Sequence, residues 1–281
     1  MLAHIAKLRN RSKGYIIVIF IVIGMLCVAG QPRYHVKAAQ NVSLELPEGV
    51  TVVKNEKQMI TRLLKGMKKH QSCFSFYYPG IGKDFAKYGR QSKAYASFMD
   101  KLAAKDGYLT GILSGVCITV CGGKHQYVTF QFHYLTTKAQ EKKIDKKAKA
   151  IARKFRKGSR AVRAKKVHDY LIQKMRYDKR YYSPYYAFTK GRGICMTYAL
   201  AYQRILQEMK IPCIYVKGSN HAWNMVKIGK YWYNVDVTWD DTGGRRYRYF
   251  LKCDAEFPNH KRPKSKWLSA LKKARSSYKF Y

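Results

Sequence analysis

The chain has 281 residues, of which 47% are hydrophobic and 14% are aromatic. This composition excludes an intrinsically disordered protein, and the length allows either one large domain or two small ones. The net charge of +40 favours polyanionic partners such as nucleic acid, anionic lipid or acidic cell-envelope polymers, although basic side chains that only solvate the surface explain it equally well.

Residues 1–38 have the layout of a secretory signal peptide. Four basic residues between positions 7 and 13 precede an uncharged apolar run of sixteen residues, Tyr15 to Gly30. As a helix this run would be about 24 Å long, which is shorter than the roughly 30 Å hydrocarbon core of a bilayer. We therefore expect cleavage and a secreted or cell-envelope protein, with an uncleaved N-terminal membrane anchor as the alternative. Removal of residues 1–38 would leave a net charge of +34, so the mature protein would remain strongly basic. Export makes acidic envelope polymers the preferred partners and nucleic acid an unlikely one.

Six cysteines follow the apolar run: Cys73, Cys117, Cys121, Cys195, Cys213 and Cys253. They could form three disulfides in an oxidising compartment, but a chain of this length does not need them, and we interpret most of them as small buried hydrophobic residues. Cys117 and Cys121 with His125 are a weak metal-site signal, because no second ligand pair has the required spacing. The sequence therefore predicts neither a metal nor a cofactor.

Residues 40–135 are predicted to form a small mixed α/β accessory region. Apolar residues recur at spacing four in Glu56–Lys69, and polar and apolar residues alternate in Cys73–Tyr77. A second helix is expected over Gln91–Ala104. The β-rich runs Gly115–Val120 and Tyr127–Tyr134, joined by Gly122-Gly123, indicate a hairpin. This region contains no catalytic motif.

Residues 136–281 are predicted to form a second, catalytic domain that begins with two basic helices. Ile144, Ala148, Ile151 and Phe155 make one apolar stripe between Thr136 and Arg180, and Val167, Tyr170, Leu171 and Met175 make another. Ser159 lies between the stripes as a candidate N-cap. The lysines and arginines fall off both stripes, where they form either a solvated helix face or a polyanion-binding surface.

The strongest local motif surrounds Cys195. Gly191-Arg192-Gly193-Ile194-Cys195 leads directly into an amphipathic pattern that continues to Met209 and predicts a buried helix with Cys195 at its start. The positive end of a helix dipole favours a thiolate, which is the reactive form of cysteine. Taken alone, Cys195 is explained better as a packed cysteine.

A β-hairpin is predicted downstream of Cys195. A possible strand Cys213–Val216 is followed by His221–Ile228 and Tyr231–Val237, which are joined by Gly229-Lys230 in a type II′ turn. If Ile228 faces Tyr231, His221 and Asp236 are diagonal neighbours on one face, about 7–8 Å apart at Cα. A three-residue loop would instead place them on opposite faces. Individually, His221 could be a buried structural histidine and Asp236 a helix cap.

These motifs together resemble the core of the transglutaminase-like superfamily. The matching patterns are Gly-x-Cys-x-x-Tyr-Ala, His-Ala-Trp-Asn and Tyr-x-Val-Asp-x-Thr-Trp-Asp, all between Gly191 and Asp241. The resemblance implies an α+β, papain-like fold in which the nucleophile helix packs on an antiparallel sheet, with Cys195, His221 and Asp236 as catalytic triad. It further implies a secreted thiol acyltransferase or peptidase that acts on amide groups of proteins or peptides. The alternative function is a non-catalytic, strongly basic cell-envelope binding or scaffold protein that retains this core.

The chain departs from this resemblance at the oxyanion site. Eukaryotic transglutaminases that resemble this core use a tryptophan upstream of the cysteine, whereas all four tryptophans here follow Cys195. The backbone N–H of Cys195 is a candidate for one oxyanion donor. The sequence assigns no second donor.

Overall fold

The protein was analysed as a computed structural model that describes residues 36–38, 46–81, 92–121, 126–243 and 246–280. Residues 31–281 form one compact unit by their internal contacts. The signal-like apolar run, the Gly122-Gly123 turn and His125 lie outside the described residues. Within the described ranges, no helix is both long and apolar enough to cross a membrane.

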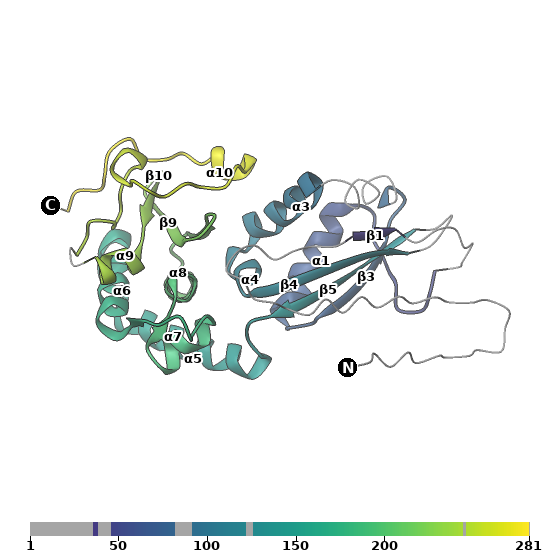
Figure 1. The fold of residues 1–281 in the computed structure, drawn as a ribbon, viewed down its shortest axis with the longest axis horizontal. Coiled ribbons are helices and arrows are strands. Elements are labelled where there is room, and N and C mark those ends of the chain that lie inside the picture. Colours follow the sequence, from purple (N-terminus) through teal and green to yellow (C-terminus); the bar gives the residue numbers. More distant parts are fainter. Residues whose placement is uncertain (1–35, 39–45, 82–91, 122–125, 244–245, 281) are drawn as a thin grey trace. The chain divides into compact units, whose positions relative to one another are not determined.

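The first part of the chain forms a five-stranded sheet covered by helices (Figure 1). Its elements are β1 (Val36–Ala38), β2 (Thr51–Val52), α1 (Glu56–Lys68), β3 (Cys73–Tyr77), α3 (Ser92–Lys105), α4 (Gly107–Gly111), β4 (Leu113–Cys121) and β5 (Tyr127–Tyr134). The strand order is β1-β4-β5-β3-β2, with antiparallel pairing in the centre and parallel pairing at both edges. The predicted helices and the antiparallel pairing of the two β-rich runs are therefore confirmed.

Strand alternation decides which face of this sheet is buried. Val128, Phe130 and Phe132 on β5 point into the core, while the residues between them are more exposed. Met59 and Leu63 of α1 pack in the same core, and the Asn55 side chain caps that helix by accepting from Gln58 N. The spacing that predicted these elements thus also predicts their buried side.

The second part of the chain surrounds a central helix. Its elements are α5 (Lys138–Lys154), α6 (Arg160–Lys174), β6 (Arg176–Tyr177), α7 (Pro184–Thr189), β7 (Arg192–Gly193), α8 (Cys195–Glu208), β8 (Cys213–Lys217), β9 (Ala222–Ile228), β10 (Tyr231–Val235), α9 (Val237–Thr242), the 3-10 helix η1 (Asp254–Glu256) and α10 (Lys266–Ser269). Helix α8 contacts α5, α6, α7, α9 and the antiparallel sheet β8-β9-β10 (Figure 1). The arrangement is α+β, with a buried helix packed on an antiparallel sheet as predicted.

Helix starts in this part follow the expected capping chemistry. Thr137 begins α5 in a capping box with Gln140, and Ser159 caps α6 by accepting from Val162 N. The Ser159 cap was predicted, and it separates the two basic helices at the expected position.

The β9-β10 hairpin has the predicted register. Tyr231 pairs with Ile228 and Val235 pairs with Asn224. Gly229 has φ 57°, while Lys230 is not among the described residues with positive φ, as in a type II′ turn. The register therefore places His221 and Asp236 just beyond the paired residues and on the same side of the hairpin.

The first and second parts of the chain meet through α4 and α8. Leu200 of α8 packs in the core formed by the five-stranded sheet. An added Cβ at Gly111 would lie 2.5 Å from Leu200 Cδ2 and 3.3 Å from Tyr215 Cδ1, so glycine permits this close approach. The domain boundary near residue 135 stays a prediction.

One sequence expectation about the cysteines is wrong. All six described cysteines are free thiols, and only Cys253 is buried, whereas Cys73 and Cys117 are exposed. Cys73 and Cys117 both pair with Gln131 across the sheet and therefore lie on its outward face. Their position in a strand, rather than their apolar character, determines their exposure.

Candidate active site

Two glycines shape the loop that leads to Cys195. Gly191 has φ 62°, and an added Cβ there would lie 2.3 Å from the carbonyl oxygen of Lys174. At Gly193 an added Cβ would lie 2.3 Å from Cβ of Thr197 on the first turn of α8. The strand pair β6-β7 and the bond from Ile194 N to Tyr181 O hold this loop in place. The glycines are required because the backbone must pass these groups closely.

Cys195 is the first residue of α8 and is half-buried. Among the described residues, no side chain caps this helix at Ile194. The unpaired N–H groups and the positive end of the dipole therefore act on whatever occupies the start of α8, including the Cys195 thiol.

His221 lies between Cys195 and Asp236. Its Nε2 lies 2.6 Å from Oδ2 of Asp236, and its side chain is only 15% exposed. Burial alone lowers the pKa of His221, but hydrogen bonds and charges from Asp236 and Cys195 raise it to about 9. Because Nε2 is engaged by the carboxylate, Nδ1 is the ring atom left to accept the thiol proton.

Asp236 has two structural roles at once. Its Oδ1 accepts from the backbone N–H groups of Thr238 and Trp239 and thereby caps α9, while Oδ2 faces His221. Burial raises the pKa of this carboxyl, yet its hydrogen bonds to His221 and His260 lower it below its ordinary value. Asp236 therefore caps α9 and orients His221 at the same time, with one carboxylate oxygen for each role.

A second histidine binds the same carboxylate oxygen. His260 Nε2 lies 2.8 Å from Asp236 Oδ2, and its side chain is fully buried. No sequence pattern indicates His260, because it lies in an irregular segment without periodicity or motif. Only its proximity in the folded chain reveals it.

His221, Asp236 and His260 are also the one described group of side chains close enough to hold a metal ion, with ligand atoms within 4.8 Å of one another. The two nitrogen–oxygen distances of 2.6 and 2.8 Å are hydrogen-bond distances. These groups thus bind one another directly, as in a proton-transfer network.

Asn224 fixes the hairpin against the nucleophile helix. Its side-chain NH₂ donates to the carbonyl oxygens of Ala199 on α8 and Ile214 on β8. His221 lies three residues before Asn224 in the chain, so these bonds hold His221 opposite the start of α8. The asparagine of the His-Ala-Trp-Asn motif consequently sets the distance between helix and sheet.

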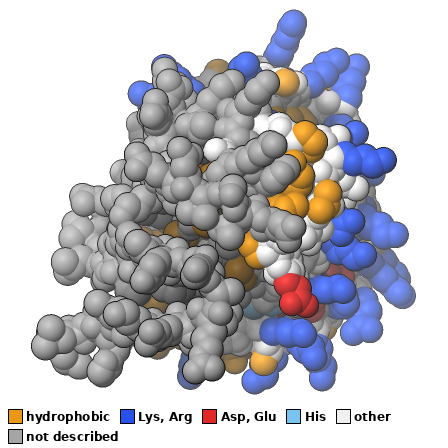
Figure 2. All heavy atoms as spheres, turned by 90° about the vertical axis from the view of Figure 1, so that its right-hand side faces the viewer, with side chains coloured by type: hydrophobic (Ala, Val, Ile, Leu, Met, Phe, Trp, Pro, Cys, Tyr) orange, Lys and Arg blue, Asp and Glu red, His pale blue; other side chains and the backbone are white. Residues whose placement is uncertain are grey.

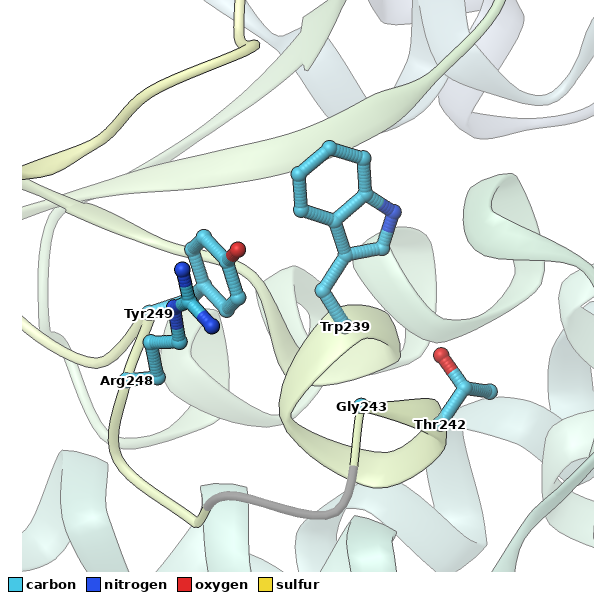
Figure 3. A pocket seen from close by; sticks show the side chains of 5 residues that line it. All are labelled: Trp239, Thr242, Gly243, Arg248 and Tyr249. Atoms are coloured by element: carbon cyan, nitrogen blue, oxygen red, sulfur yellow. The ribbon is translucent and has the colours of Figure 1, made fainter.

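A shallow pocket of about 250 Å³ lies beside Trp239 and Tyr249 (Figure 3). It is lined by Trp239, Thr242, Gly243, Arg248 and Tyr249, and the Arg248 guanidinium lies over the Tyr249 ring at 5.6 Å. The centroid of the Trp239 ring lies 5.0 Å from that of His221 and 4.3 Å from that of His260. Trp239 therefore contacts both the pocket and the histidine pair.

The family of this domain follows from a comparison with protein-family models. The model of the transglutaminase-like superfamily matches residues 134–237, a range that contains Cys195, His221 and Asp236. The chain contains a transglutaminase-like domain. This assignment agrees with the α+β arrangement described above, and the transglutaminase-like domain suggests cysteine-enzyme activity in general.

Among solved structures, the chain is similar to one described as "Crystal structure of a TGase", with 14% sequence identity and a TM-score of 0.30. The similarity covers 68% of this chain, and this chain spans only 60% of the length of that protein. No curated protein matches the chain. The catalytic roles of the three residues therefore stay predictions within a transglutaminase-like domain.

Proposed function

We propose that this protein is a thiol-dependent acyltransferase or peptidase that acts on amide groups of proteins or peptides. The observation that carries the proposal is the Cys195–His221–Asp236 arrangement, in which the 2.6 Å contact of His221 with Asp236 orients a base beside a cysteine at a helix start. An oriented imidazole beside a helix-terminal thiol is the requirement for nucleophilic acyl transfer.

In the proposed reaction, Nδ1 of His221 takes the proton of the Cys195 thiol, and the thiolate forms a bond to the amide carbonyl carbon. The carbonyl oxygen carries the resulting negative charge, and the N–H of Cys195 lies at the helix start where it can stabilise that charge. When the carbon–nitrogen bond breaks, His221 gives its proton to the leaving amine. A thioester on Cys195 remains.

The second half-reaction determines the product. Attack on the thioester by a lysine amine forms a cross-link, whereas attack by water releases a carboxylic acid. In either case His221 accepts the proton of the attacking group and returns it to the Cys195 sulfur. Both outcomes use the same three side chains.

The test compares labelling of the cysteines by iodoacetamide across pH, with each site quantified by peptide mass spectrometry. Cys195 should label fastest at neutral pH and slow in His221→Gln. Cys213 is the internal reference, because its partly buried thiol has a pKa raised above the ordinary value by desolvation and should therefore react slowly. Incorporation of a fluorescent primary amine into a glutamine peptide, measured beside ammonia release, then separates transfer from hydrolysis. Equal labelling of Cys195 and Cys213 would contradict the proposal.

Secretion, with a cleaved signal within residues 1–38, is part of the proposal and rests on the sequence pattern alone. N-terminal sequencing of the protein recovered from culture medium tests it. A mature chain that starts at residue 31 or residue 39 is the expected result, because small residues precede both positions (Val28 with Gly30, and Val36 with Ala38). Recovery of the intact N-terminus in the membrane fraction would favour the anchor instead.

An anionic cell-envelope polymer is the second proposed partner, and the charge of α5 supports it. Lys142, Lys146 and Lys149 are exposed on this helix, and none of them pairs with a described carboxylate. Figure 2 shows Lys and Arg side chains gathered along the right-hand edge and bottom of the view, with few acidic side chains beside them. A charge-reversed variant with Glu at these three positions should bind polyphosphate more weakly, and binding of the native protein should fall with salt. Equal affinity of the two proteins would contradict the proposed surface.

A further inference from the structure

The chemistry around Asp236 involves a fourth side chain. We propose that His260 is a positioning residue of the Cys195 site: its imidazolium shares the Asp236 carboxylate with His221, fixes that carboxylate and limits how strongly it draws a proton onto His221. This inference rests on the proposed function of Cys195, and it adds a residue from outside the segment matched by the family model.

The hydrogen bonds of His260 define its charge. Nε2 lies 2.8 Å from Asp236 Oδ2, and Nδ1 lies 2.8 Å from the carbonyl oxygen of Pro258. Both oxygens are acceptors when Asp236 is ionised, and its lowered pKa keeps it ionised. A neutral imidazole has one N–H and would direct a lone pair at one of these oxygens. Both bonds form together only when His260 carries two ring protons.

The His260 ring is fixed by aromatic packing. Its centroid lies 3.8 Å from that of Phe257, 4.3 Å from that of Trp239 and 5.0 Å from that of Trp223. The side chain is fully buried and Asp236 is 1% exposed, so water cannot replace the bond between them. His260 therefore has little freedom to leave Asp236.

The segment that carries His260 is in turn held on the hairpin. An added Cβ at Gly218 would lie 3.0 Å from the carbonyl oxygen of Lys261, so this glycine permits the close approach. Arg262 bonds to Asn234 Oδ1 at 3.1 Å and pairs with Asp254. These contacts on both sides of His260 fix its position relative to the catalytic residues.

The charges of the group balance during the proposed reaction. The titratable side chains that face His260 are Asp236, His221 and Tyr249, and His221 in turn faces Cys195. When the thiol proton moves to His221, the group contains a thiolate, a carboxylate and two imidazoliums, so its net charge is zero. Without the His260 charge the same state would be net negative in a site that is largely shielded from water.

The sign of the effect follows from this balance. Loss of a nearby positive charge favours protonated His221, so neutral substitutes for His260 should move the titration of His221 to higher pH. The two ring centroids are 5.4 Å apart. Coulomb's law at that distance gives an upward shift of about 0.6 units in water and about 2 units at an effective dielectric constant of 20, so a shift of about one unit is expected.

The test uses two variants. His260→Gln retains a hydrogen-bond donor but lacks the positive charge, and His260→Phe retains aromatic packing but lacks both the donor and the charge. The His221 titration, followed by NMR of ¹⁵N-labelled rings, should move upward by about one unit in both variants. A midpoint that stays within about 0.2 units of the native one would overturn the electrostatic role, because a purely structural residue would change stability without moving the titration.

One measurement on the native protein complements the variants. In the native protein at neutral pH, both ring nitrogens of His260 should show the ¹⁵N shifts of an imidazolium, and a neutral ring would refute the inference even if both variants fail to fold. Failure of the proposed function is distinguishable, because it would appear as slow labelling of Cys195 in the native protein. Fast native labelling combined with an unchanged titration in the variants would refute only the role of His260.

Discussion

The contribution of Asp236 to the base can be measured with the substitution Asp236→Asn. Bonds and charges from Asp236 and Cys195 overcome burial and raise the pKa of His221 from 6.5 to about 9. That increase corresponds to roughly 3.4 kcal/mol in favour of the imidazolium. Asp236 supplies the larger part of it, so its loss should lower the pKa by more than about 1.3 units.

The substitution should also change which ring nitrogen of His221 carries the proton. An asparagine can still accept from the backbone N–H of Thr238 with its oxygen, which leaves its NH₂ facing His221 and His260. A donor opposite Nε2 favours the tautomer with the proton on Nδ1, where it can no longer accept from the Cys195 thiol. Labelling of Cys195 at neutral pH should therefore slow more than the pKa change alone requires.

The assay is the NMR titration of ¹⁵N-labelled histidine rings, with the His221 signal identified from its loss in His221→Gln. Asp145→Asn is the matched control, because it also removes a carboxylate charge, but from the ion pair with Arg204, outside the group of His221, Asp236 and His260. The control should leave the titration near pH 9, while Asp236→Asn should move it to about 7.5 or lower. If His221 still titrates near 9 without the Asp236 charge, the electrostatic reasoning is refuted.

Two further predictions concern stability. Gly193→Ala would place a Cβ 2.3 Å from the Thr197 side chain and should lower the free energy of unfolding by about 1–3 kcal/mol in urea denaturation, whereas Gly115→Ala, whose Cβ would meet no atom closer than 3.7 Å, should cost less. Equal costs would show that the loop before Cys195 relaxes freely. The raised pKa of His221 gives stability that is fully present below pH 6.5 and is lost as the pH rises through about 9. Between pH 6.5 and 9.5 the native protein should therefore lose roughly 3 kcal/mol more stability than His221→Gln, and parallel curves for the two proteins would contradict this linkage.

The sequence predicted best those features that depend on local periodicity. The spacing of four between apolar residues of α1, the alternation of β3 and β5 and the Ser159 cap each reflect constraints that neighbouring residues impose on one another. The register of the β9-β10 hairpin was also predictable, because a two-residue turn with Gly229 first fixes every pair along the strands. From that register, the contact between His221 and Asp236 follows.

The remaining features depend on contacts between distant segments. The contact between His260 and Asp236 spans 24 positions and joins an irregular segment to a helix cap, so no spacing rule indicates it. The exposure of Cys73 and Cys117 depends on which face of β3 and β4 the core covers, and residue type alone gives the wrong answer. The identity of a second oxyanion donor likewise depends on which groups the fold brings near Cys195, and sequence spacing does not indicate it.

Helix α9 explains why Asp236 can serve both as a cap and as a partner of histidines. At its start, Asp236 bonds to the N–H groups of Thr238 and Trp239, and the Asp236 N–H donates to the carbonyl oxygen of Tyr249. One turn later, buried Asp240 lies 2.9 Å from His168 Nε2 of α6 and accepts from the Tyr249 N–H. The backbone of Tyr249, itself a turn residue, thus bonds to Asp236 and to Asp240. Because the backbone around Asp236 is held from both sides, its Oδ2 keeps a fixed position, and the distance to His221 depends on the fold rather than on a flexible side chain.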